Sequence, residues 1–163
     1  MAGKVYKMGA DVDTDVILPG RYLDVTDHEE LGRHCMEGID PDYAKKIQKG
    51  DVIFAANNFG CGSSREHAAI AIKSSGITAI VAESFARIFF RNAINNGLPV
   101  IECPEAVRAT DYGDEVEVDL TAGCINNLTK GSTFHFIPQP EYIQKLYAAG
   151  GLLPYMKNNL GEK

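Results

Sequence analysis

The sequence contains no tryptophan, no long hydrophobic run and no cluster of basic residues. Its uncharged apolar runs, such as residues 77–82, are far shorter than the roughly 20 residues that cross a bilayer, so no membrane span is expected. The first fifteen residues lack the apolar core of a signal peptide, which favours a cytoplasmic protein. The net charge of −6 and the missing basic tract argue against nucleic acid as a partner.

Cysteine is scarce and scattered. None of the four cysteines forms a C-x-x-C pair or has a histidine at ligand spacing, and the four histidines are scattered too. This pattern argues against a zinc site or an iron–sulfur cluster held by this chain alone. We interpret Cys35, Cys61, Cys103 and Cys124 as free thiols in a reducing compartment, and we expect no metal ligand.

The 163 residues, 45% of them hydrophobic, are enough for one domain with its own core, so residues 1–163 are treated as a single domain. Capping and glycine signals predict two short helices, over about 28–36 and 42–48. Continuous apolar runs at 52–56, 77–82 and 98–101 are typical of strands buried on both faces. Predicted helices at 64–74 and 84–96 connect them, which indicates parallel strands with crossover helices.

The last third has a different pattern. Residues 114–120 and 133–137 alternate polar with apolar side chains, and 121–127 resembles a turn. Such alternation predicts antiparallel strands with one face in water. A helix over 141–149 and a polar tail follow. The predicted class is therefore α/β, with parallel strands, crossover helices and added antiparallel strands.

The loop Asn57-Asn58-Phe59-Gly60-Cys61-Gly62-Ser63-Ser64-Arg65-Glu66-His67 holds the chemistry of the sequence. Its glycines permit a tight turn and close approach of backbone to a ligand. Arg65 supplies a planar guanidinium suited to a carboxylate, and the predicted helix start supplies free N–H groups. The loop therefore predicts a pocket for a carboxylate or a phosphate. It matches neither a Walker loop nor the G-x-S-x-G elbow of serine hydrolases.

Two roles for the serines remain open from the residues alone. Ser63 can act as a base if surrounding donors stabilise its alkoxide. Alternatively, Ser63 and Ser64 only cap the helix, with Glu66 or His67 completing the local hydrogen bonds.

Three segments carry a resemblance to a known family. G-C-G-S-S-R-E-H-A resembles the G-x-G-S-S-R-E-H-A motif of the swivelling domain of the aconitase superfamily. Residues 13–19 resemble that domain's opening D-T-D-x-I-x-P, and residues 84–92 resemble its S-F-A-R-I-F-x-R-N segment. The three occur in the expected order over nearly the whole chain. Within the superfamily, the chain resembles the small subunits of two-subunit hydro-lyases of the isopropylmalate isomerase type.

The resemblance implies a swivelling β/β/α domain that is active only with a separate large subunit. That partner is expected to hold a four-iron four-sulfur cluster, whereas this chain binds no cofactor. Ser63 is then the base that abstracts a proton, and Ser64 and Arg65 bind a substrate carboxylate and support the alkoxide. Asp15 matches the second aspartate of the opening motif and orients the site, unless it serves only as a turn or capping residue.

The substrate class follows from one further comparison with the family. Aconitase-like and homoaconitase-like relatives place an arginine after Tyr-Leu, whereas this chain has Asp24 between Leu23 and Val25. An aspartate repels a third carboxylate, so we expect a C4 dicarboxylate with an apolar substituent, as in isopropylmalate. Arg21 is near enough in sequence to compensate. Small subunits of dimethylmalate and citraconate hydro-lyases fit the same residues, and homoaconitase fits them less well.

Two readings from other classes stay open. One is a stand-alone anion-binding or regulatory domain, against which the intact Ser63-Ser64-Arg65 triplet argues. The other is a serine hydrolase, which requires a histidine and an acid assembled around Ser63. Arg87 and Arg91 share a helix face at i, i+4, either as solvated side chains or as a contact for the large subunit.

Overall fold

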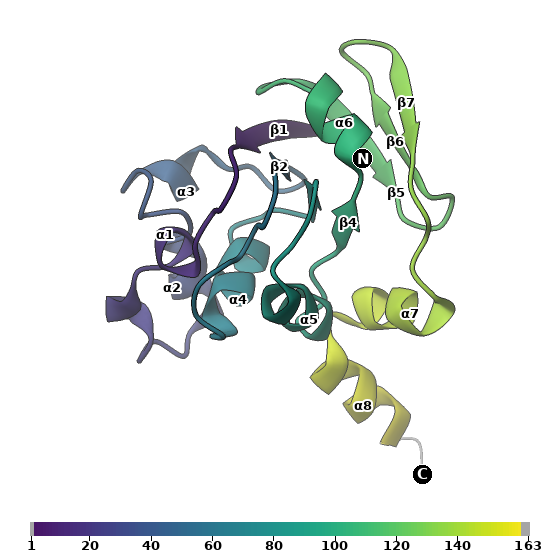
Figure 1. Ribbon diagram of the computed structural model, residues 1–163. Helices are drawn as coiled ribbons and strands as arrows, with labels where there is room; N and C mark the ends of the chain where they lie inside the picture. Colours follow the sequence, from purple (N-terminus) through teal and green to yellow (C-terminus); the bar gives the residue numbers. More distant parts are fainter. Residues whose placement is uncertain (1, 161–163) are drawn as a thin grey trace.

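The computed structural model describes residues 2–160, whose strands form a seven-stranded sheet in the order β4-β3-β2-β1-β5-β6-β7 (Figure 1). The pairs β1–β2, β2–β3 and β3–β4 are parallel, and the pairs β1–β5, β5–β6 and β6–β7 are antiparallel. The predicted fold class is therefore confirmed. The strands are β1 (Gly3–Met8), β2 (Val52–Ala55), β3 (Ala79–Ala82), β4 (Val100–Glu102), β5 (Glu115–Asp119), β6 (Cys124–Asn127) and β7 (Ser132–His135).

Helices connect the parallel strands, with α4 crossing from β2 to β3 and α5 crossing from β3 to β4. None of the helices within residues 2–160 is long and apolar enough to cross a membrane. The helices are α1 (Thr14–Ile17), the 3-10 turn η1 (Gly20–Tyr22), α2 (His28–Arg33), α3 (Tyr43–Lys46), α4 (His67–Ser74), α5 (Arg87–Asn95), α6 (Pro104–Ala109), α7 (Glu141–Ala149) and α8 (Leu152–Leu160).

The parallel strands are buried on both faces, which explains their continuous apolar runs. Successive side chains of a strand point to opposite faces. Ile53 and Ile80 therefore lie in a core shared with α2, α4 and α5, whereas Phe54 and Val81 lie in a second core. The second core is closed by α6 and by residues of the antiparallel strands such as Ile125.

The antiparallel strands turn back over the second face of the sheet. The Cys103 thiol, just after β4, lies 3.7 Å from the carbonyl oxygen of His135 at the end of β7, although these strands are at opposite ends of the sheet order. Figure 1 shows β5, β6, β7 and α6 together on one side of the molecule. One half of the sheet thus covers the other.

Several local predictions were wrong. The segment 121–127 contains β6, whose buried members Ile125 and Asn127 are too few to show a strand period. α6, which was not predicted, begins at Pro104, and proline is favoured at the first position of a helix. α8 occupies the predicted polar tail, has no buried residue, and extends away from the sheet in Figure 1. The predicted helix 64–74 begins only at His67, which changes the description of the site below.

Candidate functional site

The three motif segments meet where the parallel strands end. After β1, the carbonyl of Val12 accepts from the N–H of Gly60 at 2.8 Å, and Thr14 N–H donates to the carbonyl of Cys61 at 2.8 Å. After β3, the carbonyl of Ser84 accepts from the N–H of Phe59 at 3.1 Å. Loops that follow parallel strands share one edge of the sheet, the usual place for ligands in such folds. The motifs therefore form one surface rather than three.

The two glycines of the central loop are required by its geometry. Gly60 has φ +84° and Gly62 has φ +101°, a region that disfavours residues with a Cβ. A Cβ on Gly60 would lie 2.2 Å from the ring of Phe89, and one on Gly62 would lie 2.6 Å from Asp13 Oδ2. The loop can thus pack against α5 only with glycine at position 60, and against the opening motif only with glycine at position 62.

Ser63 is held by its neighbours rather than by a helix. Its N–H donates to Thr14 Oγ1 at 3.0 Å. Its Oγ accepts from Arg65 Nε at 2.6 Å and from the Arg65 N–H at 3.3 Å. A hydroxyl oxygen that receives two donors, one of them cationic, is favoured in its deprotonated form. The geometry therefore suits a base.

The prediction that these serines lie at a helix start is wrong, and so is the reading of them as helix caps. The N-cap of α4 is Glu66, which makes no capping side-chain hydrogen bond. Residues 63–65 lie in a loop before α4, so the Arg65 guanidinium, not a helix dipole, supplies the positive charge beside Ser63. Within residues 2–160, Ser63 Oγ is bonded by Arg65 and by no histidine, which argues against a serine hydrolase.

Asp15 contacts the same arginine. Its Oδ1 lies 3.5 Å from Arg65 Nη2, and its side chain is 64% exposed. Asp13 caps α1 by accepting the Asp15 N–H at 2.7 Å, which fixes the start of α1 and the position of Asp15 in its first turn. An exposed pair of this kind contributes at most about 1 kcal/mol to stability.

Ser64 is exposed, and the residue that holds its backbone was missed from the sequence. Asn92 of α5 donates from Nδ2 to the Ser64 carbonyl at 3.0 Å, and Asn96 donates to Glu66 Oε1 at 3.2 Å. Asn92 is the last residue of the third motif segment, so the resemblance included the residue but not its contact with Ser64. The side-chain amides of Asn92 in α5 and of Asn96, its C-cap residue, therefore both donate hydrogen bonds to the segment that follows Ser63.

Of the three residues predicted to set substrate specificity, Leu23, Asp24 and Val25, only Leu23 lies beside Arg65. Leu23 lines a small hollow together with Asp15 and Arg65. Asp24 is exposed, whereas Val25 packs against the main core. Arg21, expected as a possible compensating charge, pairs instead with Glu37. The remaining residues around the hollow are Thr14, Leu18, His67 and Ala68.

The cysteine of the motif is not a nucleophile. Burial raises the pKa of the Cys61 thiol, and the nearby carboxylates of Asp13 and Asp11 raise it further. The thiol is therefore protonated at neutral pH and less reactive than an ordinary cysteine. Among residues 2–160, no three His, Cys, Asp or Glu side chains are placed so that they could hold a metal ion together, so these residues do not fit an iron–sulfur cluster.

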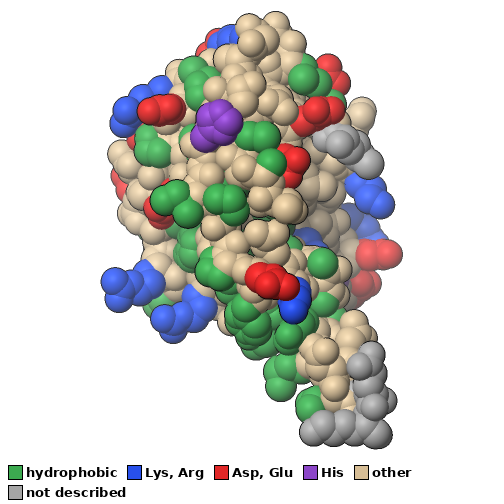
Figure 2. All heavy atoms as spheres, turned by 90° about the vertical axis from the view of Figure 1, so that its right-hand side faces the viewer, with side chains coloured by type: hydrophobic (Ala, Val, Ile, Leu, Met, Phe, Trp, Pro, Cys, Tyr) green, Lys and Arg blue, Asp and Glu red, His purple; other side chains and the backbone are tan. Residues whose placement is uncertain are grey.

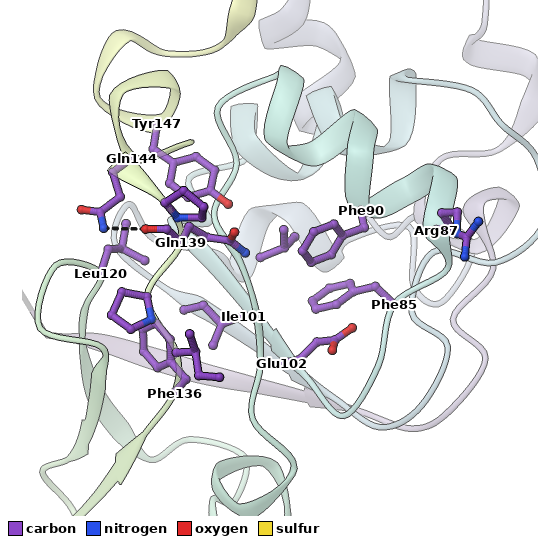
Figure 3. Close-up of a pocket in the computed structure, with 14 residues that line it drawn as sticks. Phe85, Arg87, Phe90, Ile101, Glu102, Leu120, Phe136, Gln139, Gln144 and Tyr147 are labelled. Carbon is purple, nitrogen blue, oxygen red and sulfur yellow. Dashed lines mark hydrogen bonds between the residues drawn. The ribbon is translucent and has the colours of Figure 1, made fainter. Parts of the chain in front are cut away.

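A larger hollow, about 710 Å³, is shown in Figure 3, and neither motif serine lines it. It runs between α5, β4 and the segment 136–140, and its labelled lining includes Phe85, Phe90, Ile101, Phe136 and Tyr147. The rings of Phe85 and Phe90 face the gap from one side in Figure 3. This hollow is mainly apolar and holds none of the residues predicted to do chemistry.

Comparison with known proteins places the chain in a family. A family model described as the aconitase C-terminal domain matches residues 11–106. The 3-isopropylmalate dehydratase small subunit of Caldicellulosiruptor bescii is 55% identical over 97% of this chain and 95% of its own length. The 2,3-dimethylmalate dehydratase small subunit of Eubacterium barkeri is 56% identical over 94% of both chains.

A solved structure agrees with these matches. The crystal structure of 3-isopropylmalate dehydratase from Methanocaldococcus jannaschii has a TM-score of 0.91 and 49% sequence identity to this chain. The likeness covers 98% of this chain and 94% of that one. The resemblance predicted from the three motifs is confirmed, and the chain belongs to the aconitase C-terminal domain family, among the small subunits of its dehydratases.

Proposed function

We propose that this chain is the small subunit of a hydro-lyase that interconverts 2-isopropylmalate and 3-isopropylmalate, a step of leucine biosynthesis in the cytoplasm. The observation that carries the proposal is the pair of hydrogen bonds from Arg65 to Ser63 Oγ, the shorter of them 2.6 Å. The names of the relatives support the reaction class and the role of a small subunit.

In the proposed mechanism, Ser63 is the catalytic base. Its alkoxide takes the proton from the substrate carbon next to the carbon that carries the hydroxyl, and becomes a serine hydroxyl. The electron pair of the broken C–H bond forms the double bond as the hydroxyl departs. Rehydration then takes place in the opposite sense: hydroxide adds to the carbon that lost its proton, and Ser63 gives its proton to the carbon that lost its hydroxyl, which yields the other isomer. General base catalysis of this kind is worth about 10²–10⁴-fold in rate.

Arg65 has two tasks in this mechanism. Its Nε stabilises the Ser63 alkoxide, and the rest of its guanidinium is free to grip a substrate carboxylate with Ser64. Asp15, 3.5 Å from Arg65 Nη2, orients the guanidinium for both. Because Ser64 and Asp15 are exposed, a carboxylate can approach them from solvent.

The large subunit completes the site. The hollow beside Arg65 is shallow in this chain alone, which suits half of a site closed by a second protein. We assign the four-iron four-sulfur cluster to that partner, where it supplies a Lewis acid. This chain's residues supply the base and one carboxylate clamp.

The substituent of the substrate is proposed to be apolar because of what surrounds Leu23. Leu23 faces the hollow with Leu18 and Ala68, whereas the nearby cation Arg21 is held by Glu37 and Tyr22. A third carboxylate would therefore not find Arg21 free to pair with it. A second candidate, a dimethylmalate hydro-lyase, is favoured by the relative of that name at 56% identity.

Anaerobic reconstitution with the large subunit from the same genome tests the proposal. Alkene absorbance is followed with isopropylmalate, dimethylmalate, citramalate and homocitrate. We expect turnover of isopropylmalate, and a loss of about 10²–10⁴-fold in Ser63→Ala. Ser132→Ala, in the antiparallel half, is the matched control and should retain the wild-type rate. No turnover of any substrate with an intact cluster would instead favour a binding domain.

A further inference from the structure

A second polar cluster lies behind the segment that contains Leu23. Glu37 accepts from the Tyr22 hydroxyl at 2.6 Å and from the Arg21 guanidinium, both through Oε1. Its Oε2 lies 2.6 Å from His34 Nδ1. We call Arg21, Tyr22, His34 and Glu37 the Glu37 cluster. Three partners on one carboxylate are more than a surface ion pair needs.

The cluster is compact and partly shielded from water. The Glu37 side chain is 12% exposed and that of His34 is 29% exposed. The rings of Tyr22 and His34 stack with centroids 3.9 Å apart and planes 12° from parallel. The Arg21 guanidinium lies 4.8 Å from the centre of the Tyr22 ring. Hydrogen bonds to an ionised carboxylate in such a setting are among the stronger ones in proteins.

The contacts of Glu37 favour the ionised form of its carboxyl group. Burial acts to raise the pKa of its carboxyl, but the hydrogen bonds from Tyr22, His34 and Arg21 outweigh it, so the pKa lies below the usual value. The carboxylate is thus ionised at neutral pH and accepts from all its donors.

The backbone that carries Glu37 is fixed from both sides. Met36 N–H donates to the carbonyl of Ile17 at 2.7 Å, and Gly38 N–H donates to the carbonyl of Val16 at 3.0 Å. A Cβ on Gly38 would lie 2.5 Å from Val16 Cα, so the two segments are in direct contact. Because Val16 and Ile17 belong to α1, Glu37 is attached to the same helix that carries Asp15.

We propose that Glu37 is a positioning residue for substrate selection, an inference that rests on the proposed function. By holding Tyr22 and Arg21, it fixes the turn that follows them and keeps Leu23 directed into the hollow beside Arg65. Within the turn, Leu23 N–H donates to Gly20 O at 3.2 Å and Val25 N–H donates to Tyr22 O at 3.0 Å, and the side chains of Tyr22 and Val25 also pack against the main core. Glu37 thereby sets the room for the substrate's apolar substituent.

Hydrogen exchange of the isolated chain tests the anchoring without any activity. In Glu37→Ala, the amides of Leu23 and Val25 should exchange about 10- to 100-fold faster, the equivalent of one charge-assisted hydrogen bond. The strand amides should keep their wild-type rates. Tyr22→Phe keeps the stacking and should give a smaller acceleration, and Glu37→Gln, which retains one acceptor, should restore part of the protection. Glu141→Ala, an exposed carboxylate of α7, is the control.

Two exchange results would overturn the anchoring. Unchanged rates at Leu23 and Val25 would show that Glu37 does not fix the turn. Acceleration spread over the whole chain would show a general role in stability instead.

The reconstituted enzyme tests the link to selection. We expect the preference for isopropylmalate over dimethylmalate, measured as the ratio of kcat/KM, to change at least about fivefold in Glu37→Ala, mainly through KM. One methylene is worth about 10- to 200-fold in discrimination, so the effect is within reach of a displaced leucine. Equal loss for both substrates would refute the link. If the wild type turns over neither substrate, the proposed function and the selection role fail together, while the exchange result still decides the anchoring.

Discussion

The strands β1 to β4 and the strands β5 to β7 share one sheet, yet the segments that leave them carry different side chains. The loops after β1, β2 and β3 bring Asp15, Ser63 and Arg65 together, with Asn92 behind them. The antiparallel half carries no motif residue and borders the apolar hollow of Figure 3. Parallel strands aim their following loops at one edge, whereas hairpins spread theirs over two. The chemistry is thus confined to one edge of the sheet.

The two halves also differ in their exposed surface. The large apolar side chains left exposed beyond the last strand are Ile137, Tyr142, Leu153, Met156 and Leu160. Figure 2, which faces this part of the molecule, shows hydrophobic side chains gathered low on the surface, near the projecting end. The motif edge instead exposes Asp15 and Ser64. Most of the large exposed apolar side chains therefore lie away from Asp15 and Ser64, although Ile39 and Ile88 of the parallel half are exposed too.

The largest expected effect breaks the motif edge. Arg65→Gln removes the donor 2.6 Å from Ser63 Oγ and should lower kcat/KM of the reconstituted enzyme about 10²–10³-fold, the usual loss for one donor to a developing oxyanion. Arg108→Gln, an exposed arginine of α6 that pairs with Glu83, should leave the rate near wild type. Equal rates for the two variants would contradict the assignment of Arg65.

Alanine substitution of one glycine in each half tests how much a positive φ and a close contact cost in stability. Gly62→Ala combines φ +101° with a Cβ 2.6 Å from the Asp13 carboxylate, and should cost about 2–3 kcal/mol of unfolding free energy. Gly131→Ala has φ +69° but nothing within 4 Å, and should cost about 1 kcal/mol. Urea denaturation measures both. A cost for Gly131→Ala as large as that for Gly62→Ala would show that the contact with Asp13 is unimportant.

Two asparagines should separate activity from stability. Asn92→Ala loses the bond to the Ser64 carbonyl, about 1 kcal/mol, and should lower kcat roughly fivefold with little change in stability. Asn127→Ala removes a 1% exposed side chain that donates to Asp114 at 2.9 Å. It should cost about 1–3 kcal/mol of stability and leave kcat unaltered. If Asn127→Ala lowered kcat and Asn92→Ala did not, the assignment of the site to the parallel half would be contradicted.

The smallest effect is a pH dependence located in the antiparallel half. The Asp111 N–H, the Asn127 amide and Lys130 hold the pKa of Asp114 below its usual value, against the opposing effect of burial. The ionised group therefore contributes stability above its unfolded pKa, near about 3.9, and this contribution is lost as the pH falls through the folded pKa. Urea titrations should show Asp114→Asn less stable than wild type at neutral pH, with the difference shrinking towards about pH 3. A difference independent of pH would argue against this network.

β2 and β3 could be predicted from the sequence because burial on both faces leaves continuous apolar runs, whereas β1, which contains Lys4 and Lys7, was not predicted. β6 was missed because it has four residues and a buried asparagine whose partner, Asp114, lies 13 residues away. α8 was missed because none of its residues is buried, so no apolar period marks a packed face. Local patterns therefore predict elements packed on a core better than elements held by distant polar bonds or left exposed.

The site was predictable to a similar degree. The motif named Ser63, Ser64 and Arg65, but the expected helix start was three residues early, because Ser63 is bonded by Arg65 rather than by helical N–H groups. No spacing in the sequence indicates that Asn92 reaches Ser64, since 28 residues separate them. The roles of Ser63 and Arg65 remain predictions that the variants above test.

A double-mutant cycle at saturating substrate tests the central claim, that Arg65 acts through Ser63. The measurement is kcat of the reconstituted enzyme for wild type, Ser63→Ala, Arg65→Gln and the double variant. Residues that act as a unit are not additive. The double variant should therefore be within about threefold of Ser63→Ala alone, far above the product of the two separate losses. Losses that multiply in full would contradict the account, because Arg65 would then act independently of the serine.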